Sequence, residues 1–370
     1  MRKFRLIAIS AGVLAATAFG GIRVSAQEIV GVSGVFFENF HFDDPDEAGI
    51  ENVSLMSVPI GFSTPIIDWL SVDLRTTFAR GEMTRDDGTE VTLSGLTDTE
   101  LRANFDIIPQ RLTISAAALL PTGQSTQSMD ESELAGLIAA DLLPFRVSNW
   151  GSGGGAGLVS TLTVPVGEFG VGVSAGYTMG MEFEPLEEDE LGYRPGSEMR
   201  LRVAIDRNIG STAKASLILG GQIYQDDELS GASVFTPGDR FEATGSLAFR
   251  VGALSSGVAY AGMLHRGEGM LLDFEMSTPA QDLFNVGFGF RIPRGATTFQ
   301  PMADVRIFRR SDGIDQGYLT SLGATVEWPT GPVVLLPTLK GRFGKALLWD
   351  GAESAVRGAE LGLGIRYRTR

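Results

Sequence analysis

The stretch 359–369, AELGLGIRYRT, alternates apolar residues with polar residues or glycine along its whole length. Side chains of a β-strand point alternately to its two faces. One face of this stretch carries Ala359, Leu361, Leu363, Ile365 and Tyr367, and the other carries Glu360, Gly362, Gly364, Arg366 and Arg368. The same two-residue period occurs in 70–78, 100–107, 198–206 and 240–251. This pattern predicts an all-β fold in which each strand has an apolar and a polar face.

The connections between these stretches alternate regularly between short and long. We predict short connections at 64–68, 108–110, 165–168, 210–211, 252–253, 293–296 and 329–332. We predict long ones at 43–49, 82–94, 122–153, 182–196, 226–238, 266–280, 309–317 and 345–357. Bacterial outer-membrane barrels have short periplasmic turns, long extracellular loops and an even number of strands. The sequence therefore predicts a transmembrane antiparallel β-barrel of about sixteen strands, with fourteen as the alternative and both termini on the periplasmic side.

The first 26 residues have the order of a secretion signal. Arg2, Lys3 and Arg5 precede the apolar run 6–19, and small residues lead to a cleavage site at Ala26. The apolar run is shorter than the roughly twenty residues of a spanning helix. We therefore expect a signal peptide over 1–26, a barrel over 27–370, and export to the bacterial outer membrane.

Composition excludes several classes of function. The chain has no cysteine, which excludes disulfides, thiol nucleophiles and a lipidated cysteine. Its net charge of −15 becomes −19 once the four basic residues of the signal are removed, and such a balance disfavours nucleic-acid binding. The two histidines have no serine at a catalytic spacing, and no phosphate loop or metal-ligand spacing occurs. We predict no enzyme activity, no cofactor and no metal, and expect the acidic loops to meet lipopolysaccharide.

The polar faces of the predicted strands carry charges of both signs. In a barrel the apolar face meets lipid and the charged face meets the lumen. The predicted lumen charges include Asp73, Arg75, Glu100, Arg102, Arg200, Arg202, Arg250 and Arg366. Two interpretations remain open: these charges pair across neighbouring strands, or they form a ladder whose transverse field sorts solutes in a wet channel.

The longest predicted loop, between strands five and six, contains a helical pattern. Asp130 with Glu133 has the spacing of a capping box, and Pro144 stops the pattern, so we predict a helix over 131–143. Its apolar face carries Leu134, Leu137, Ile138 and Leu142. A helix this apolar requires burial, so we expect it to fold into the barrel as a constriction or to line an apolar substrate gate.

Two resemblances follow from short motifs. The segment 362–367, GLGIRY, resembles the C-terminal signal read by the barrel-assembly machinery, which implies that this machinery is a partner through Gly362, Ile365 and Tyr367. The segments 95–101 (GLTDTEL), 111–114 (RLTI) and 120–123 (LPTG) resemble the phenol meta-pathway and FadL/TodX-type outer-membrane transporters. That resemblance covers about thirty residues and implies uptake of hydrophobic small molecules. The chain departs from the family because strand one follows Gln27 with no N-terminal hatch.

Three functions remain open from the sequence. The first is a channel or transporter for small, hydrophobic or aromatic solutes. The second is a general diffusion porin, in which sixteen strands and an inward loop would also occur. The third is a closed barrel that serves as an anchor or scaffold and conducts nothing.

Overall fold

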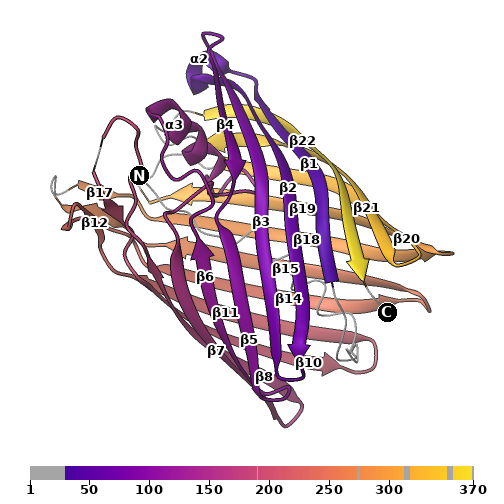
Figure 1. The fold of residues 1–370 in the computed structure, drawn as a ribbon. Coiled ribbons are helices and arrows are strands. Elements are labelled where there is room, and N and C mark those ends of the chain that lie inside the picture. Colours follow the sequence, from indigo (N-terminus) through magenta and orange to yellow (C-terminus); the bar gives the residue numbers. More distant parts are fainter. Residues whose placement is uncertain (1–29, 190, 273–275, 312–316, 348–352, 369–370) are drawn as a thin grey trace.

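The computed structural model describes residues 30–189, 191–272, 276–311, 317–347 and 353–368. Most of them belong to one antiparallel barrel (Figure 1). Its strands are β1 (Val30–Phe42), β2 (Ile50–Ile67), β3 (Leu70–Arg85), β4 (Glu90–Leu96), β5 (Thr99–Ile108), β6 (Leu112–Leu120), β7 (Gly155–Val166), β8 (Phe169–Gly180), β10 (Glu198–Ile209), β11 (Ala213–Tyr224), β14 (Arg240–Val251), β15 (Ser255–Arg266), β18 (Gln281–Arg294), β19 (Thr297–Arg310), β20 (Gly317–Thr330), β21 (Val333–Leu347) and β22 (Glu353–Arg368).

The barrel has sixteen strands and is closed. Its sheet contains 17 segments, but β4 and β5 both pair with β3 and form one strand interrupted at residues 97–98, so the described part of the chain gives 17 − 1 = 16. The first strand closes the ring by pairing with the last, from Val30 opposite Arg368 to Phe42 opposite Val356. Closure leaves no edge strand with unpaired backbone groups, as a hydrocarbon environment requires.

The barrel has apolar side chains outside and polar side chains inside. Leu201 and Leu361, on the predicted lipid faces of β10 and β22, are 55% and 54% exposed. Inward, Glu38 and Glu360 are 0% and 1% exposed, the reverse of a soluble protein. This arrangement confirms the predicted assignment of the strand faces.

The turns at one end of the barrel are tight, as predicted. The turns after β7 and β10 use Gly167 and Gly210 in the left-handed region, with φ of 62° and 61°, which favours glycine. At the other end, two of the loops are shorter than predicted. The strand pair β3–β4 continues to Arg85 and Glu90 through the predicted loop 82–94, and β21 and β22 extend into 345–357, because backbone pairing continues past the apolar part of each strand.

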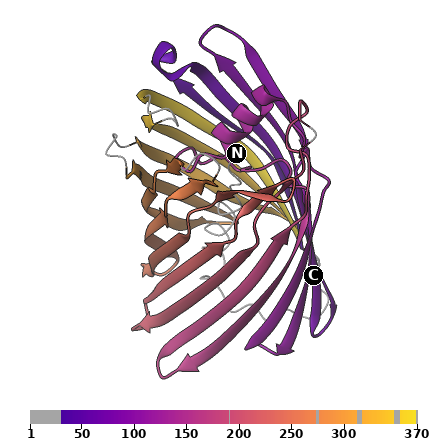
Figure 2. The ribbon, with the colours of Figure 1, turned by 90° about the vertical axis from the view of Figure 1, so that its left-hand side faces the viewer.

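The loops of this second end form structure of their own. A short helix, α2 (Pro45–Ala48), lies between β1 and β2. Short strands β9 (Tyr193–Arg194), β12 (Asp227–Leu229), β13 (Ala232–Thr236), β16 (Gly269–Leu271) and β17 (Met276–Thr278) form a second, five-stranded sheet. This sheet extends the barrel wall beyond the ends of strands β8 to β18, and β12 and β17 are labelled at the left of Figure 1; Figure 2 views this side.

Aromatic residues near strand ends divide between the two faces. Trp69, Tyr177 and Trp328 are exposed outside the barrel, as an interfacial girdle requires. Phe40 and Phe42 are 0% exposed and point inward, because β1 faces a hydrophobic cluster inside the mouth. Among the described residues, no helix has the length and apolar character needed to cross a membrane. The predicted signal peptide lies outside the described residues.

Candidate functional site

The loop between β6 and β7 folds into the barrel mouth and carries helix α3 (Met129–Ile138). The N-cap is Ser128, whose hydroxyl accepts a hydrogen bond from the Glu131 backbone N–H at 3.3 Å, while Glu131 accepts one from the Ser128 N–H at 3.0 Å. The prediction that Asp130 and Glu133 form the capping box is therefore wrong. Both carboxylates instead bind Arg85 of β3, at 2.7 and 2.6 Å.

The helix is shorter than predicted and ends at Ile138. The segment after it turns inward and buries Leu142, Leu143 and Phe145, which are 4%, 4% and 3% exposed. A continued helix would spread these side chains around its axis, whereas the irregular chain places all three in one hydrophobic cluster.

The four residues predicted as a substrate gate are buried. Leu134, Leu137, Ile138 and Leu142 are 0%, 1%, 2% and 4% exposed. They belong to the same cluster as Leu55, Met83 and Leu93 of the barrel wall, and α3 lies against β3 and β4 (Figures 1 and 2). Leu137 and Leu142 also border a cavity beside the helix. The helix thus packs along one wall of the mouth.

The two ends of the loop are held together by Asp98, at the interruption between β4 and β5. Its carboxylate accepts hydrogen bonds from the Gly123 N–H at 3.1 Å and from the Ser152 N–H and hydroxyl at 2.7 and 2.9 Å. Asp98 belongs to the 95–101 motif and Gly123 to the 120–123 motif, so the two segments that resemble the transporter family meet at the neck of this loop.

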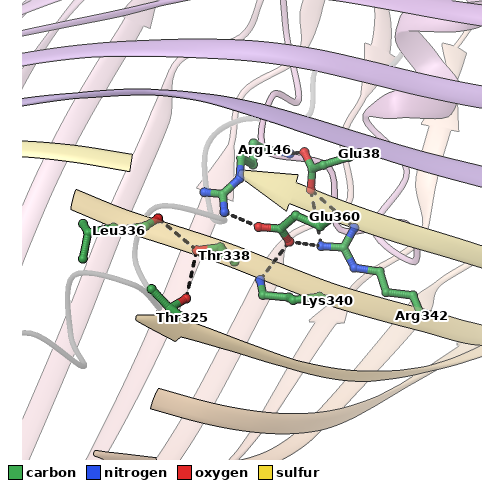
Figure 3. A network of polar contacts seen from close by, with 8 residues as sticks. All are labelled: Glu38, Arg146, Thr325, Leu336, Thr338, Lys340, Arg342 and Glu360. Carbon is green, nitrogen blue, oxygen red and sulfur yellow. Dashed lines mark hydrogen bonds and ion pairs between the residues drawn. The ribbon is translucent and has the colours of Figure 1, made fainter. Parts of the chain in front are cut away.

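The middle of the loop is anchored to the barrel wall through Arg146 (Figure 3). Its guanidinium forms an ion pair with Glu360 of β22, and its backbone N–H donates to Glu38 of β1 at 2.9 Å. Glu360 also accepts from Lys340 at 2.9 Å and from Arg342 at 2.6 Å, and Arg342 reaches Glu38 at 3.3 Å. Glu38, Arg146, Lys340, Arg342 and Glu360 form what we call the anchor cluster.

An aromatic ring supports the same contact. The Arg146 guanidinium lies 3.7 Å from the centroid of the Phe36 ring, a cation–π geometry. A Cβ at position 362 would lie 2.2 Å from the Phe36 ring, so Gly362 leaves the space that this ring fills. Nearby, Phe145 meets Phe40 edge to face, with ring centroids 5.1 Å apart. Charge, ring stacking and apolar burial therefore fix the loop at one place.

The opposite wall carries a row of arginine and glutamine side chains. The register places Arg200, Gln222, Arg240, Arg266, Gln281 and Arg310 opposite one another on six successive strands. Arg240 is 5% exposed, and its side chain forms no hydrogen bond or ion pair with any described residue. Arg306, below this row, donates to the backbone carbonyl of Asp141 in the loop at 2.9 Å. The Asp141 carboxylate interacts electrostatically with both Arg240 and Arg306.

A cavity of about 540 Å³ lies beside α3. The helix and the segment after it contribute small and apolar side chains, among them Ala135, Gly136, Ala140 and Leu142. The loop 182–196 contributes Phe183, Pro185 and Tyr193, and the barrel wall contributes Gln281, Phe308 and Arg310. Residue Gln127 pairs with Leu186, which ties the two loops together above the cavity.

The charges predicted for the lumen mostly pair with close neighbours. Arg102 binds Glu100 at 2.9 Å, and Asp73 accepts from Asn104 at 2.8 Å. Pairs also join Arg200 with Glu198 at 2.6 Å, Arg202 with Glu242 at 2.7 Å, and Arg366 with Glu327 at 3.2 Å. Arg75 lies opposite Glu100 in the register, and Arg250 is exposed near the turn after β14.

Sequence reasoning did not single out Arg146, Glu38 or Arg240. A basic residue directly after the apolar run 134–145 is the one signal that could have indicated Arg146.

Comparisons with known proteins support the barrel fold. No protein-family model matches the sequence, and no curated protein matches it. The OprB structure from Pseudomonas putida matches with a TM-score of 0.53 and 11% identity, over 93% of this chain and 94% of that chain. The outer-membrane channel DcaP of Acinetobacter baumannii gives a TM-score of 0.44 and 12% identity, over 95% and 100% of the two chains. A Rhodopseudomonas blastica porin mutant gives 0.40 and 12%, over 92% and 100%.

The likeness to OprB concerns the fold. With a TM-score of 0.53 and an identity of 11%, it shows that the two chains share the antiparallel β-barrel fold. Membership of the FadL/TodX type is not shown, so that resemblance stays a prediction based on the segments 95–101, 111–114 and 120–123.

Proposed function

We propose that this protein is an outer-membrane channel for small solutes, in which the loop between β6 and β7 sets the width of the passage. The observation that carries the proposal is the anchored loop: the Asp98 neck, the buried leucines and the Arg146 contacts hold it inside a sixteen-stranded barrel. Barrels of this strand number are wide enough for an aqueous channel unless loops narrow them.

The loop leaves part of the mouth lined by polar groups. It packs against β1–β4 and β19–β22, whereas the inner face of β10–β15 carries Arg200, Gln222, Arg240 and Arg266. Such a wall favours water, and the apolar cavity beside α3 favours solutes with an aromatic or aliphatic part. A preference for hydrophobic or aromatic solutes is thus our proposal for this channel. The buried gate residues act in it by placing the loop.

Single-channel conductance in planar bilayers tests the proposal. The full chain should give a steady conductance, and deletion of 128–145 should increase it, since this removes α3 and the segment that crosses the mouth. Circular dichroism provides the control that the deletion variant keeps its strands. Absence of conductance from both proteins would reject the channel and favour a closed anchor or scaffold.

The predicted partners belong to the same proposal. Ile365 and Tyr367 are 38% and 41% exposed on the outside of the last strand, where an assembly factor could read them before closure with β1. We propose recognition by the barrel-assembly machinery through these side chains and Gly362, and contact of the acidic loops with lipopolysaccharide. Replacing Ile365 and Tyr367 by serine should reduce the amount of assembled barrel in the outer membrane, and unchanged assembly would contradict the role.

A further inference from the structure

We propose that the cavity beside α3 and the arginine row form a binding site for small amphipathic carboxylates, molecules that join one carboxylate to an aromatic or short aliphatic group. The inference rests on the proposed channel and names the class of solute that the channel selects.

The first step is the state of Arg240. An arginine that is only 5% exposed ordinarily has a carboxylate or carbonyl partner, because burying an unpaired charge is costly. Yet the Arg240 side chain makes no hydrogen bond or ion pair with the described residues, and its Nε is buried without an acceptor. Its register neighbour Arg266 carries the same charge. An incoming carboxylate would supply the missing acceptors with the two-pronged geometry that guanidinium prefers.

The second step is the position of Arg240 relative to the cavity. The register runs from Arg240 through Arg266 to Gln281, which lines the cavity. Neighbouring strands are about 4.8 Å apart, and β15 lies between the strands of Arg240 and Gln281. The backbones at these two positions are therefore roughly 10 Å apart along the barrel wall. Asp141 links the two places, since it lines the cavity and interacts electrostatically with Arg240. One small molecule can therefore place its charge toward Arg240 and its apolar part toward α3.

The third step is the apolar part of the site. Ala135, Gly136 and Ala140 present little side-chain bulk to the cavity, whose volume of about 540 Å³ lies in the range of small-molecule sites. A Cβ added at Gly136 would meet no atom within 4 Å, so the space next to this glycine is open. A flat aromatic ring can occupy the space that these small residues leave.

Calorimetric titration of the full chain in detergent tests this site with three probes. Benzoate carries both features, benzyl alcohol has the ring without the charge, and acetate has the charge without the ring. We expect benzoate to bind at least tenfold more tightly than either of the others. Equal affinities for benzoate and benzyl alcohol would overturn the proposal, as would equal affinities for benzoate and acetate.

Two variants and one control locate the site. Arg240→Gln should weaken benzoate binding about tenfold or more while leaving that of benzyl alcohol within about threefold, because only the charge contact is lost. Gly136→Leu fills the cavity and should weaken both ring-bearing probes about tenfold. Arg309→Gln, on an exposed arginine of β19 that stacks on Phe284, should change neither. Benzoate affinity equal in the Arg240 and Arg309 variants would overturn the proposal.

Permeation separates this inference from the proposed function. Proteoliposomes containing the protein should swell in sodium benzoate and swell more slowly with Arg240→Gln. Swelling without any benzoate binding would keep the channel and reject the carboxylate site. Specific binding without swelling would reject the channel and keep the site.

Discussion

Replacing Arg146 by methionine should release the loop from the barrel wall without weakening the barrel. The substitution keeps an unbranched side chain but removes the ion pair with Glu360 and the stacking on Phe36. The wall side of the anchor cluster then contains two carboxylates and two cations, because Glu38 and Glu360 still contact Lys340 and Arg342. No uncompensated charge remains in the wall.

The magnitude follows from the two lost contacts. A hydrogen-bonded pair between charged groups contributes about 1.5 to 3 kcal/mol, and a cation–π contact about 0.5 to 2 kcal/mol. Because 35% of the Arg146 side chain is exposed, solvent screening reduces both contributions, and we expect a total of about 2 to 3 kcal/mol. The fraction of molecules with a detached loop should therefore rise about 30- to 140-fold.

Thiol labelling measures this fraction directly, because the natural chain has no cysteine. A cysteine introduced by Leu142→Cys, at a site that is 4% exposed, reacts with a water-soluble maleimide only when the loop opens. Its labelling rate should rise by the same 30- to 140-fold in the Arg146→Met background, and single-channel records should show transitions to a larger conductance. Arg85→Met is the matched control, since it removes two ion pairs at the exposed start of α3 and should change labelling less than about fivefold. Equal labelling rates in the two backgrounds would refute the anchor.

Three further predictions follow from the same contacts. Glu360→Gln leaves Glu38 as the one carboxylate of the anchor cluster, beside the cations Arg146, Lys340 and Arg342. The free energy of unfolding, measured with urea in detergent, should therefore fall by about 3 to 5 kcal/mol, and an unchanged unfolding midpoint would contradict this. Asp98→Ala leaves the Ser152 N–H and hydroxyl without their acceptor, and labelling of the Leu142→Cys thiol should accelerate at least tenfold, which Asp87→Ala in an exposed turn should not reproduce. Leu134→Ser creates a cavity at a fully buried site and should raise conductance by loosening the loop; reduced uptake of an apolar solute at unchanged conductance would instead favour a gate.

The barrel could be predicted from sequence because its signals are local. Alternation in 198–206 and 359–369 assigns each side chain to a face, and the turn residues Gly167 and Gly210 mark the short connections. These features depend on neighbours within a few positions, so no long-range information is needed. The same holds for the apolar helix in the loop, whose existence was predicted although its capping residue and its end were not.

The anchor cluster and the arginine row could not be predicted in this way. Glu38 and Arg342 are separated by 304 residues, and they meet only because closure of the ring places β1 beside β22. Arg240 and Arg266 share a row because of the strand register, which alternation alone does not fix. The sequence therefore predicts which polar residues face the inside of the barrel, but it does not predict which residues on other strands they meet there.

Strand β3 explains why the loop belongs inside the barrel. In its lower part Leu74 and Phe78 face outward and Asp73 faces inward, as in a membrane-embedded wall. In its upper part the polarity reverses, since Arg80 and Glu82 are about half exposed outside while the inward Ala79 and Met83 are 0% and 1% exposed. A wall that is polar outside and apolar inside would expose its inner face to water unless something covered it. The α3 loop is that cover, so the loop is part of the hydrophobic core of the mouth, and its position is set by folding itself.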